Sequence, residues 1–443
     1  MKIVQAVGWY YPDSLGGTEV YVTGLCRRLR AAGHEVLVAA PDPAHDRERV
    51  YEHDGVPVYR FPIPAAPTRA ECQGRVVVRG AELFHGWLAI QRPDIVHAHT
   101  FVTGLGLAEL RAAKATGARV IVTTHAGSLG WVCQRGTMMR WGQHLCDGVC
   151  EPAKCAACEL QRRGLTRSLA RIVGAIPPAL GRAARGLPGK VGTALAMGDL
   201  IARNRGMQRD MLATVDTFVL LTRWALEAVV ANGAPRSKLV LNRLGQSQEK
   251  VTMKPGPEDR PTTPPVAVGY LGRFDPIKGV YDLARAVTSL PPDVPIRVEF
   301  RGPVPDRADR AVLHELRALV AGDPRVTFAP AVGETEALRV LADYDVLCCP
   351  AVCLEGGPTV AIEAHAVGTP VIGTRIGGLA ELVTDGVNGR LIPPGDWRAL
   401  ADALRDLAAN PVGTIDRWRL ALPPARTMDQ VAADYLTLYN GTD

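Results

Sequence analysis

The first forty residues alternate between apolar runs, a glycine-rich loop and an amphipathic stretch. Residues 2–7 are mostly apolar, WYYPDSLGG follows, and residues 18–32 place Val22 and Leu29 on one helical face. A second apolar run at 35–40 completes a strand–loop–helix–strand unit. Units of this kind build parallel sheets, so we predict an α/β protein with a doubly wound parallel sheet.

The same order of elements restarts in the second half of the chain, at residues 266–271. Just before it, KPGPEDRPTTPP has five prolines among twelve residues, which excludes a helix or a central strand and predicts a linker. The sequence therefore predicts two Rossmann-like domains in tandem. Their bounds are an N-terminal, acceptor-side domain at 1–253, the linker at 254–265, a nucleotide-sugar domain at 266–426, and a closing helix at 427–443 that packs back on the first domain.

The formal charge of +6 is unevenly distributed. From Glu159 to Arg209 there are ten Lys or Arg against two acidic residues. This argues against a nucleic-acid coat and predicts one basic face, from Arg162 to Arg209, for an anionic or membrane-linked acceptor. No apolar run reaches the roughly 20 residues of a membrane span. No signal-peptide pattern opens the chain, so we expect a cytoplasmic protein, in peripheral contact with the inner face of the membrane.

A glycine pair and a histidine stand where two predicted strands end. Gly16 and Gly17, followed by Glu19, come after the first strand, and glycines let a backbone approach a phosphate closely. His125 ends a later strand. Ligands of open α/β sheets collect at such ends, so we predict all four as site residues. A tight turn and a structural histidine are the alternatives, and the absence of GxGxxG argues against an NAD enzyme.

The second domain has the loop GRFDPIKG after its first strand. Arg273 can fork onto phosphate oxygens and Lys278 adds a point charge five residues later. The alternative is that Arg273 and Lys278 are two ordinary solvent-exposed surface cations, as most Arg and Lys residues are. The position at a strand's carboxyl end favours phosphate binding here.

The stretch CLEGGPTVAIEAHAVGTPVIGTRIGG carries two carboxylates. Glu355 lies in a loop with Gly356 and Gly357, and Glu363 lies in the helix predicted at 359–367. A loop that opens into a helix directs backbone N–H groups at one place, which suits a phosphate. Carboxylates only accept hydrogen bonds, so they suit a hydroxyl-rich ligand.

Five of the ten cysteines crowd an insert predicted at 128–163. They are Cys133, Cys146, Cys150, Cys155 and Cys158. Without an export signal, such a cluster is more typical of a metal site than of disulfides. Four thiolates would bind zinc or hold a [4Fe–4S] cluster, with one cysteine spare. Because the cluster has no obvious reactive position, we expect this metal to be structural and to give an insert without a core its folding centre. Buried free thiols are the alternative.

Together these motifs resemble those of the family-4 retaining glycosyltransferases. That family has the GT-B fold, in which two Rossmann-like domains face each other across a cleft. The resemblance covers essentially the whole chain. It rests on Gly16-Gly17-x-Glu19, Thr124-His125, Gly272-Arg273 with Lys278-Gly279, Glu355 with Glu363, Gly368-Thr369-Pro370, and Gly377-Gly378, which we expect to form a loop.

The resemblance implies transfer of a sugar from a UDP-, GDP- or ADP-sugar. The acceptor would be a cell-envelope polysaccharide, a lipid-linked glycan or a small molecule. Arg273 and Lys278 would hold the diphosphate and stabilise its developing charge, so the chemistry itself needs no cofactor. Glu363 would bond the ribose hydroxyls.

The sugar would be met from both domains. The resemblance implies that Glu355, with the backbone of Gly356 and Gly357, contacts it from the second domain. His125 would face it from the first domain, where Gly16-Gly17 would close on the phosphates. In this family, catalysis means positioning and electrostatics, without a settled protein nucleophile.

Two other functions stay open at this point. A sugar-nucleotide epimerase or a phosphorylase could share the fold, but no lysine has a context suited to a Schiff-base cofactor. A non-catalytic protein could use the cysteine cluster as a nucleic-acid-binding metal module. The acidic Asp147, Glu151 and Glu159 fit that alternative poorly.

Overall fold

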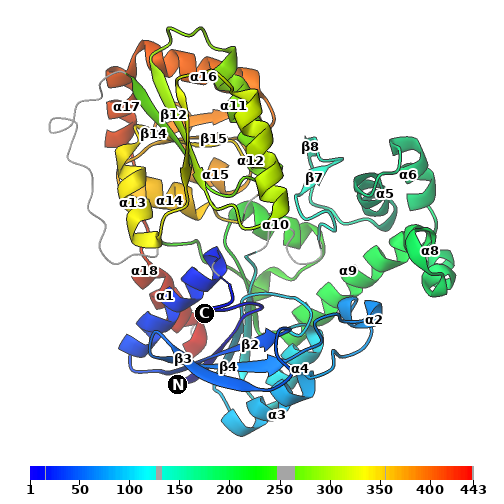
Figure 1. Cartoon of the computed structure of the whole chain (residues 1–443). Helices are drawn as coiled ribbons and strands as arrows, with labels where there is room; N and C mark the ends of the chain where they lie inside the picture. The colour runs from blue at the N-terminus through cyan, green and yellow to red at the C-terminus, as the bar shows by residue number, and fades with distance from the viewer. Residues whose placement is uncertain (15, 126–131, 247–264, 355, 442–443) are drawn as a thin grey trace. The chain divides into compact units, whose positions relative to one another are not determined.

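The structure is a computed structural model that describes residues 1–14, 16–125, 132–246, 265–354 and 356–441 (Figure 1). The chain divides into two compact units. Unit 1 comprises Met1–Ser247 and Thr427–Asp443, and unit 2 comprises Gln248–Arg426. The linker predicted at 254–265 lies outside the described residues except for its last residue. Within the described ranges, no helix combines the length and apolar character needed to cross a membrane.

Unit 1 contains an eight-stranded sheet in the order β10-β9-β6-β5-β1-β2-β4-β3. The strands are β1 (Lys2–Ala6), β2 (Glu35–Asp42), β3 (Arg49–His53), β4 (Val56–Pro62), β5 (Ile95–Ala98), β6 (Arg119–Thr123), β9 (Thr217–Leu220) and β10 (Leu239–Leu241). All neighbours pair in parallel except β3 and β4. Every residue of β5 and β9 is buried, as expected for central strands of a parallel sheet that helices cover on both faces.

Strand β3 was not predicted, and it makes one edge of the sheet antiparallel. Its side chains alternate between half-buried and exposed, so its sequence shows no apolar run. Asp54 and Gly55 join β3 to β4 with φ angles of 54° and 72°. Two consecutive positive φ angles match the tight hairpin turn for which Asp-Gly is favoured.

Helices cover this sheet, and the last helix of the chain is one of them. They are α1 (Gly17–Ala31), α2 (Arg69–Cys72), α3 (Ala81–Gln91), α4 (Leu107–Ala115), α10 (Arg223–Ala231) and α18 (Met428–Asn440). Helix α18 packs against α1. A capping box of Thr427 and Gln430 starts α18, and Gly441 ends it in a left-handed conformation.

The insert has more regular structure than its sequence suggests. Within its predicted bounds, 128–163, it contains the hairpin of β7 (Met139–Arg140) and β8 (His144–Leu145) and the helix α5 (Pro152–Arg162). Four helices follow the insert: α6 (Arg167–Gly174), α7 (Pro178–Ala183), α8 (Gly189–Leu195) and α9 (Met197–Thr214). The expectation that the insert lacks a core is wrong. Helix α5 packs against α6 and α9 around Ala156, Leu160 and Met197.

Unit 2 contains a fully parallel six-stranded sheet in the order β13-β12-β11-β14-β15-β16. The strands are β11 (Val266–Leu271), β12 (Ile296–Gly302), β13 (Val326–Pro330), β14 (Val346–Cys349), β15 (Val371–Thr374) and β16 (Gly389–Ile392). The helices are α11 (Val280–Ser289), α12 (Arg307–Leu319), α13 (Glu334–Asp343), α14 (Thr359–Ala366), α15 (Gly377–Leu382), α16 (Trp397–Ala409) and α17 (Pro411–Leu420).

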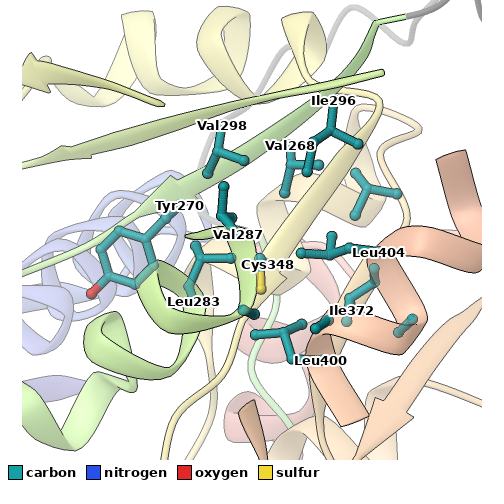
Figure 2. Close-up of a cluster of buried hydrophobic side chains, with 14 of the residues drawn as sticks. Val268, Tyr270, Leu283, Val287, Ile296, Val298, Cys348, Ile372, Leu400 and Leu404 are labelled. Carbon is teal, nitrogen blue, oxygen red and sulfur yellow. The ribbon is translucent and has the colours of Figure 1, made fainter. Parts of the chain in front are cut away.

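The core between this sheet, α11 and α16 fixes the strand positions. Figure 2 shows Cys348 of β14 among Leu283, Ile372 and Leu400. Cys348 is 1% exposed, so it serves as an apolar core residue. One local prediction is wrong: Gly377-Gly378 is the first turn of α15 and not a loop.

Candidate functional site

The loop at 272–279 follows β11, and close backbone contacts fix its path. At Gly279, φ is 75° and a Cβ would lie 1.9 Å from the carbonyl oxygen of Pro350. A Cβ on Gly302, at the end of β12, would lie 1.8 Å from the carbonyl oxygen of Gly272. Neither glycine can be replaced without moving backbone, so this loop is pressed against the end of β12 and the segment after β14.

Hydrogen bonds join the same loop to its neighbours. The N–H of Val352, after β14, donates to the carbonyl oxygen of Ile277 at 2.8 Å. The hydroxyl of Thr374, at the end of β15, donates to the carbonyl oxygen of Ala351 at 2.7 Å. The carboxyl ends of β11, β14 and β15 therefore meet at one edge of the unit 2 sheet, where open α/β folds bind ligands.

The two predicted phosphate ligands of unit 2 lie in this loop. The Arg273 side chain is 56% exposed, and its Nη2 lies 3.5 Å from Asp275 Oδ2. Asp275 also accepts the N–H of Ile277 at 3.0 Å and so caps the 3₁₀ turn Pro276–Lys278. Lys278 is half-buried at the end of that turn. The loop thus holds two cationic side chains at a ligand-binding edge of the sheet.

The remaining predicted ligands of unit 2 surround the start of α14. Gly356 and Gly357 are half-buried and lead through Pro358 into the helix. Glu363 lies on α14 and is also half-buried. Glu355 lies outside the described residues, and its role stays a prediction. The contacts with the predicted phosphate loop come from Pro350 and Val352, earlier in the segment that leads from β14 to this glycine loop.

In unit 1, the predicted glycine pair begins α1. Gly16 is the N-cap, and its carbonyl oxygen accepts the N–H of Val20 at 3.1 Å. Glu19 is 6% exposed and accepts a hydrogen bond from the Ser14 hydroxyl at 2.7 Å. A Cβ on Gly16 would lie 2.6 Å from Glu19 Oε2. Glu19 therefore braces the glycine loop from within the protein, and its role as a ligand stays a prediction.

His125 follows β6 and belongs to a chain of hydrogen bonds. Its Nε2 lies 3.2 Å from His99 Nδ1, and His99 Nε2 lies 2.6 Å from Gln5 Oε1. An amide oxygen only accepts, so His99 carries its proton on Nε2 and accepts through Nδ1. His125 consequently donates from Nε2. Its Nδ1 is left as the acceptor of the neutral ring.

Burial keeps these imidazoles uncharged. Burial lowers the pKa of His125 to about 4. Burial, with a smaller contribution from neighbouring imidazoles, lowers the pKa of His97 and of His99 well below the ordinary value. The Tyr21 ring packs edge-on against His125, with 4.9 Å between ring centroids. At neutral pH, His125 is a neutral hydrogen-bonding group and not an imidazolium.

The network continues into α18. Tyr439 Oη accepts the Gln5 side-chain N–H at 3.2 Å and lies 2.7 Å from His97 Nδ1. His97 Nε2 lies 2.8 Å from the hydroxyl of Thr123, which in turn lies 2.8 Å from Tyr435 Oη. The C-terminal helix α18 thus supplies two phenol groups to the hydrogen-bond network around His125.

The sequence predicted His125 as a site residue, but it predicted none of the side chains that form the hydrogen-bond network around it. A histidine at both ends of the triplet His97-Ala98-His99, where β5 ends, was a usable signal, because alternate strand residues share a face. Gln5 and Tyr439 gave no such signal, since they lie 434 residues apart in sequence.

A pocket of about 770 Å³ lies in unit 1 at the carboxyl ends of β1, β2, β4 and β5. Its wall is rich in apolar side chains, including Trp9, Ile63, Val76, Phe101 and Met207. Two carboxylates of the wall are engaged within the protein. Glu71 accepts the N–H of Thr68 at 2.7 Å, and Glu109 accepts the N–H of Gly106 at 2.7 Å.

The five cysteines of the insert are all free thiols. Four of them, Cys133, Cys146, Cys155 and Cys158, line a second, smaller pocket. Cys150 is buried beside these four, and its thiol forms a hydrogen bond with the thiol of Cys155. In the described part of the chain, no three Cys, His, Asp or Glu side chains already stand together as ligands for a metal ion. The metal site thus has no support from ready-made ligand geometry and stays a prediction.

Two family models match the chain. One, described as "Glycosyl transferase 4-like domain", matches residues 16–245, just over half of the chain. The other, described as "Glycosyl transferases group 1", matches residues 265–410. The two matches lie in unit 1 and unit 2, respectively.

Several curated relatives are named "D-inositol 3-phosphate glycosyltransferase". The protein of Corynebacterium urealyticum is 35% identical over 173 residues, 38% of this chain and 39% of the relative. The protein of Streptomyces coelicolor is 27% identical over 412 residues, 89% of this chain and 80% of the relative. In the Corynebacterium match and two similar ones from mycobacteria, the aligned part spans only 31% to 39% of the relative's length.

Solved structures share the two-domain GT-B fold over almost the full length. Sucrose-phosphate synthase from Thermosynechococcus elongatus has a TM-score of 0.66 at 19% identity, covering 100% of this chain and 99% of that one. Anabaena HepE in complex with UDP and glucose has a TM-score of 0.63 at 14% identity, covering 100% of both. The catalytic domain of Arabidopsis starch synthase IV, bound to ADP and acarbose, has a TM-score of 0.63 at 15% identity, covering 99% of both.

Proposed function

Because the chain belongs to the glycosyltransferase 4-like family, we propose that it is a retaining glycosyltransferase that moves a sugar from a nucleotide-sugar donor to an acceptor. One observation carries this proposal: the loop with Arg273 and Lys278 contacts the segment that follows β14 and leads towards α14, at the carboxyl ends of β11 and β14. The family matches do not favour an epimerase, a phosphorylase or a non-catalytic metal-binding protein.

In the proposed reaction, the donor diphosphate binds Arg273 and Lys278. As the bond between the sugar and the diphosphate breaks, negative charge grows on the leaving phosphate, and these cations stabilise it. A guanidinium fork can take two phosphate oxygens at once, which orients the leaving group. Glu363 would accept the ribose hydroxyls, and Glu355 with Gly356 and Gly357 would contact the sugar.

His125 would hydrogen-bond the sugar as a neutral ring. Its Nε2 proton is committed to His99, so Nδ1 is the atom left to accept a hydroxyl proton. A neutral imidazole suits this task better than a cation, because the transition state of the sugar is itself oxocarbenium-like and would be repelled by positive charge. The glycine pair Gly16-Gly17 would approach the phosphates.

The unit 1 pocket is the proposed acceptor site. Its apolar wall, with Trp9 53% exposed and Val76 53% exposed, favours an acceptor that brings an apolar portion next to the reacting hydroxyl. Among the three acceptor classes predicted from the sequence, this feature favours a lipid-linked one over a fully hydrophilic polysaccharide.

Donor binding is the most direct test. We expect UDP, GDP or ADP to raise the melting temperature of the full chain, and the corresponding sugar nucleotide to be consumed. Nucleotides of this kind are present in solved structures of the same fold. No shift with any of the three at millimolar concentration would contradict the proposal.

Two variants separate binding from chemistry. Glu363→Ala should mainly raise the donor KM, and Glu355→Ala should mainly lower kcat. Asp402→Ala, which removes an exposed carboxylate of α16, is the matched control and should leave both constants unchanged. Wild-type transfer by both Glu variants would contradict these roles.

We also propose that the basic segment from Arg162 to Arg209 contacts an anionic membrane surface. In this segment, Ile172, Leu180 and Val191 are 70%, 67% and 69% exposed. Apolar side chains exposed on short helices among many arginines are typical of helices that lie in a lipid interface. This proposal places the protein at the inner face of the membrane.

Vesicle flotation tests this contact. The chain should float with vesicles that contain anionic phosphatidylserine and should remain with the unbound fraction when the vesicles are purely zwitterionic. Ile172→Gln should weaken flotation, whereas Ile90→Gln, at a residue of α3 that is 80% exposed, should not. No flotation with anionic vesicles at low salt would overturn the membrane contact.

A further inference from the structure

The hairpin β7–β8 places Cys133 and Cys146 close together in space. Cys133 precedes β7, and its carbonyl oxygen accepts the N–H of Gly136 at 3.0 Å in a tight turn. Cys146 directly follows β8, and its N–H donates to the carbonyl oxygen of Met138 at 2.9 Å. Two cysteines at the open end of a two-stranded hairpin can present their sulfurs to one point.

Helix α5 supplies two more thiols. Cys155 and Cys158 stand three residues apart on α5, so their side chains lie on the same face of the helix. The face that they share is one wall of the small pocket that Cys133 and Cys146 also line. Four thiols from two different elements thus surround one space.

Backbone amides point at two of these sulfurs. The N–H of Met138 donates to Cys133 Sγ at 3.4 Å, and the N–H of Trp141 donates to Cys158 Sγ at 3.3 Å. Such hydrogen bonds stabilise the negative charge of a thiolate, and they recur around metal-bound cysteine sulfur. Arg135, Arg140 and Lys154 also line the pocket, and their charge complements the net negative charge of a metal held by four thiolates.

The fifth cysteine is placed differently. Cys150 is 1% exposed, packs in the core that α5 forms with α6 and α9, and does not line the pocket. Its thiol nevertheless forms a hydrogen bond with the thiol of Cys155, so Cys150 is a direct neighbour of the four cysteines. Its backbone N–H donates to Asn232 Oδ1 at 2.8 Å, which anchors the insert to the end of α10. The lining of the pocket therefore favours the other four cysteines as ligands and Cys150 as the spare one.

We propose that Cys133, Cys146, Cys155 and Cys158 hold a structural metal centre as thiolates, and that Cys150 is not a ligand. Binding releases the four thiol protons and draws the sulfurs inwards to about 2.3 Å from the metal; no three potential ligands in the described ranges already stand at that spacing. The centre would fasten the hairpin to α5. This proposal is independent of the sugar-transfer reaction.

Metal content of the full chain is the first measurement. We expect about one zinc ion, or about four iron atoms with sulfide and broad visible absorbance, per chain purified without chelator and without air. Either metal supports the proposal, and the spectrum distinguishes the two. Less than a tenth of either amount would overturn it.

Alanine variants test the ligand set. Each of Cys133→Ala, Cys146→Ala, Cys155→Ala and Cys158→Ala should lose the metal, and Cys150→Ala is the matched control that should retain it. Loss of the metal from Cys150→Ala to the same extent as from the other four would overturn the assignment.

Native alkylation covers the case in which a variant fails to fold. In the wild-type chain, iodoacetamide should modify the four ligand thiols about tenfold more slowly before chelator treatment than after it. The exposed Cys72 should react equally in both samples and so calibrates the experiment. Equal reactivity of the four thiols before and after chelation would contradict the proposal.

Discussion

The two units place different chemistry at equivalent places, the carboxyl ends of their parallel strands. In unit 2, the polar groups are cations such as Arg273, and the rigidity comes from backbone contacts that allow no side chain at Gly279 or Gly302. In unit 1, the polar groups under His125 are neutral, and the rigidity comes from hydrogen bonds between side chains. The same architecture therefore carries exposed cationic side chains in unit 2 and an uncharged network of histidines in unit 1.

The largest effect should come from removing charge in unit 2. Lys278→Ala should lower kcat/KM by about 100- to 1000-fold, because a cation that stabilises the leaving phosphate is lost. Arg285→Ala, at an exposed cation of α11, is the control and should change kcat/KM less than about twofold. Steady-state kinetics, with the donor identified by thermal shift, measures kcat/KM for both variants. Equal effects of the two substitutions would show that Lys278 acts no differently from an ordinary surface cation.

Acid should affect unit 1 more than unit 2. Unit 1 contains three neighbouring histidines with lowered pKa values, His97, His99 and His125. Among the described residues of unit 2, one histidine has such a shift: burial lowers the pKa of His365 to about 4. Below the ordinary pKa of 6.5, the unfolded chain binds protons that these folded histidines do not. The free energy of unfolding should therefore fall with decreasing pH, by about 1.4 kcal/mol per pH unit for each such histidine.

Hydrogen exchange at pH 7.5 and pH 5 can follow the two units separately. Peptides from β5 and α18 should lose more protection on acidification than peptides from β14 and α14. The window stays above the range in which most carboxylates titrate. Equal losses in both units would show that the histidine network does not set the acid stability of unit 1.

Loss of the support for His125 should have a smaller effect on activity. His99→Leu leaves the Nε2 proton of His125 without its acceptor and should lower kcat by about 5- to 100-fold, with little change in the donor KM. His99→Gln, which can still accept a hydrogen bond, should recover part of the loss. A change in KM alone would indicate a purely structural role for His99.

The smallest effect is expected at Tyr439, two hydrogen bonds beyond His99. Tyr439→Phe removes a hydroxyl that binds both Gln5 and His97, which should cost about 1–2 kcal/mol of unfolding free energy. Its effect on kcat should be below that of His99→Leu, because the bond between His99 and His125 is retained. Denaturant titration and the same kinetic assay provide both numbers.

The sequence was most informative where local chemistry decides the structure. Buried strands such as β14 are apolar throughout, and the glycines at 272 and 279 lie at strand and helix boundaries, so both could be located without coordinates. β3 escaped prediction because its burial alternates, and α15 because Gly377-Gly378 is more often a loop.

Local sequence patterns could not predict the hydrogen-bond network inside unit 1. The hydrogen-bond partners of His97 come from β6 and α18. The residues around Tyr435 and Tyr439 do not indicate a polar role, because both tyrosines fit the buried face of an amphipathic helix. Contacts of this kind depend on how distant segments pack, and periodicity carries no information about that. For the same reason, the spacing of the cysteines could not predict that Cys150 lies outside the pocket that the other four line.

The return of α18 to unit 1 has a consequence for biosynthesis. The ribosome synthesises the whole of unit 2 before Tyr435 and Tyr439 emerge. Until then, Gln5 and His97 of the nascent unit 1 lack their final hydrogen-bond partners. Domains made earlier usually fold first, but here the earlier one is completed last. Deleting the segment from 428 onwards should therefore leave unit 2 folded and render unit 1, far away in sequence, dependent on chaperones and sensitive to proteases.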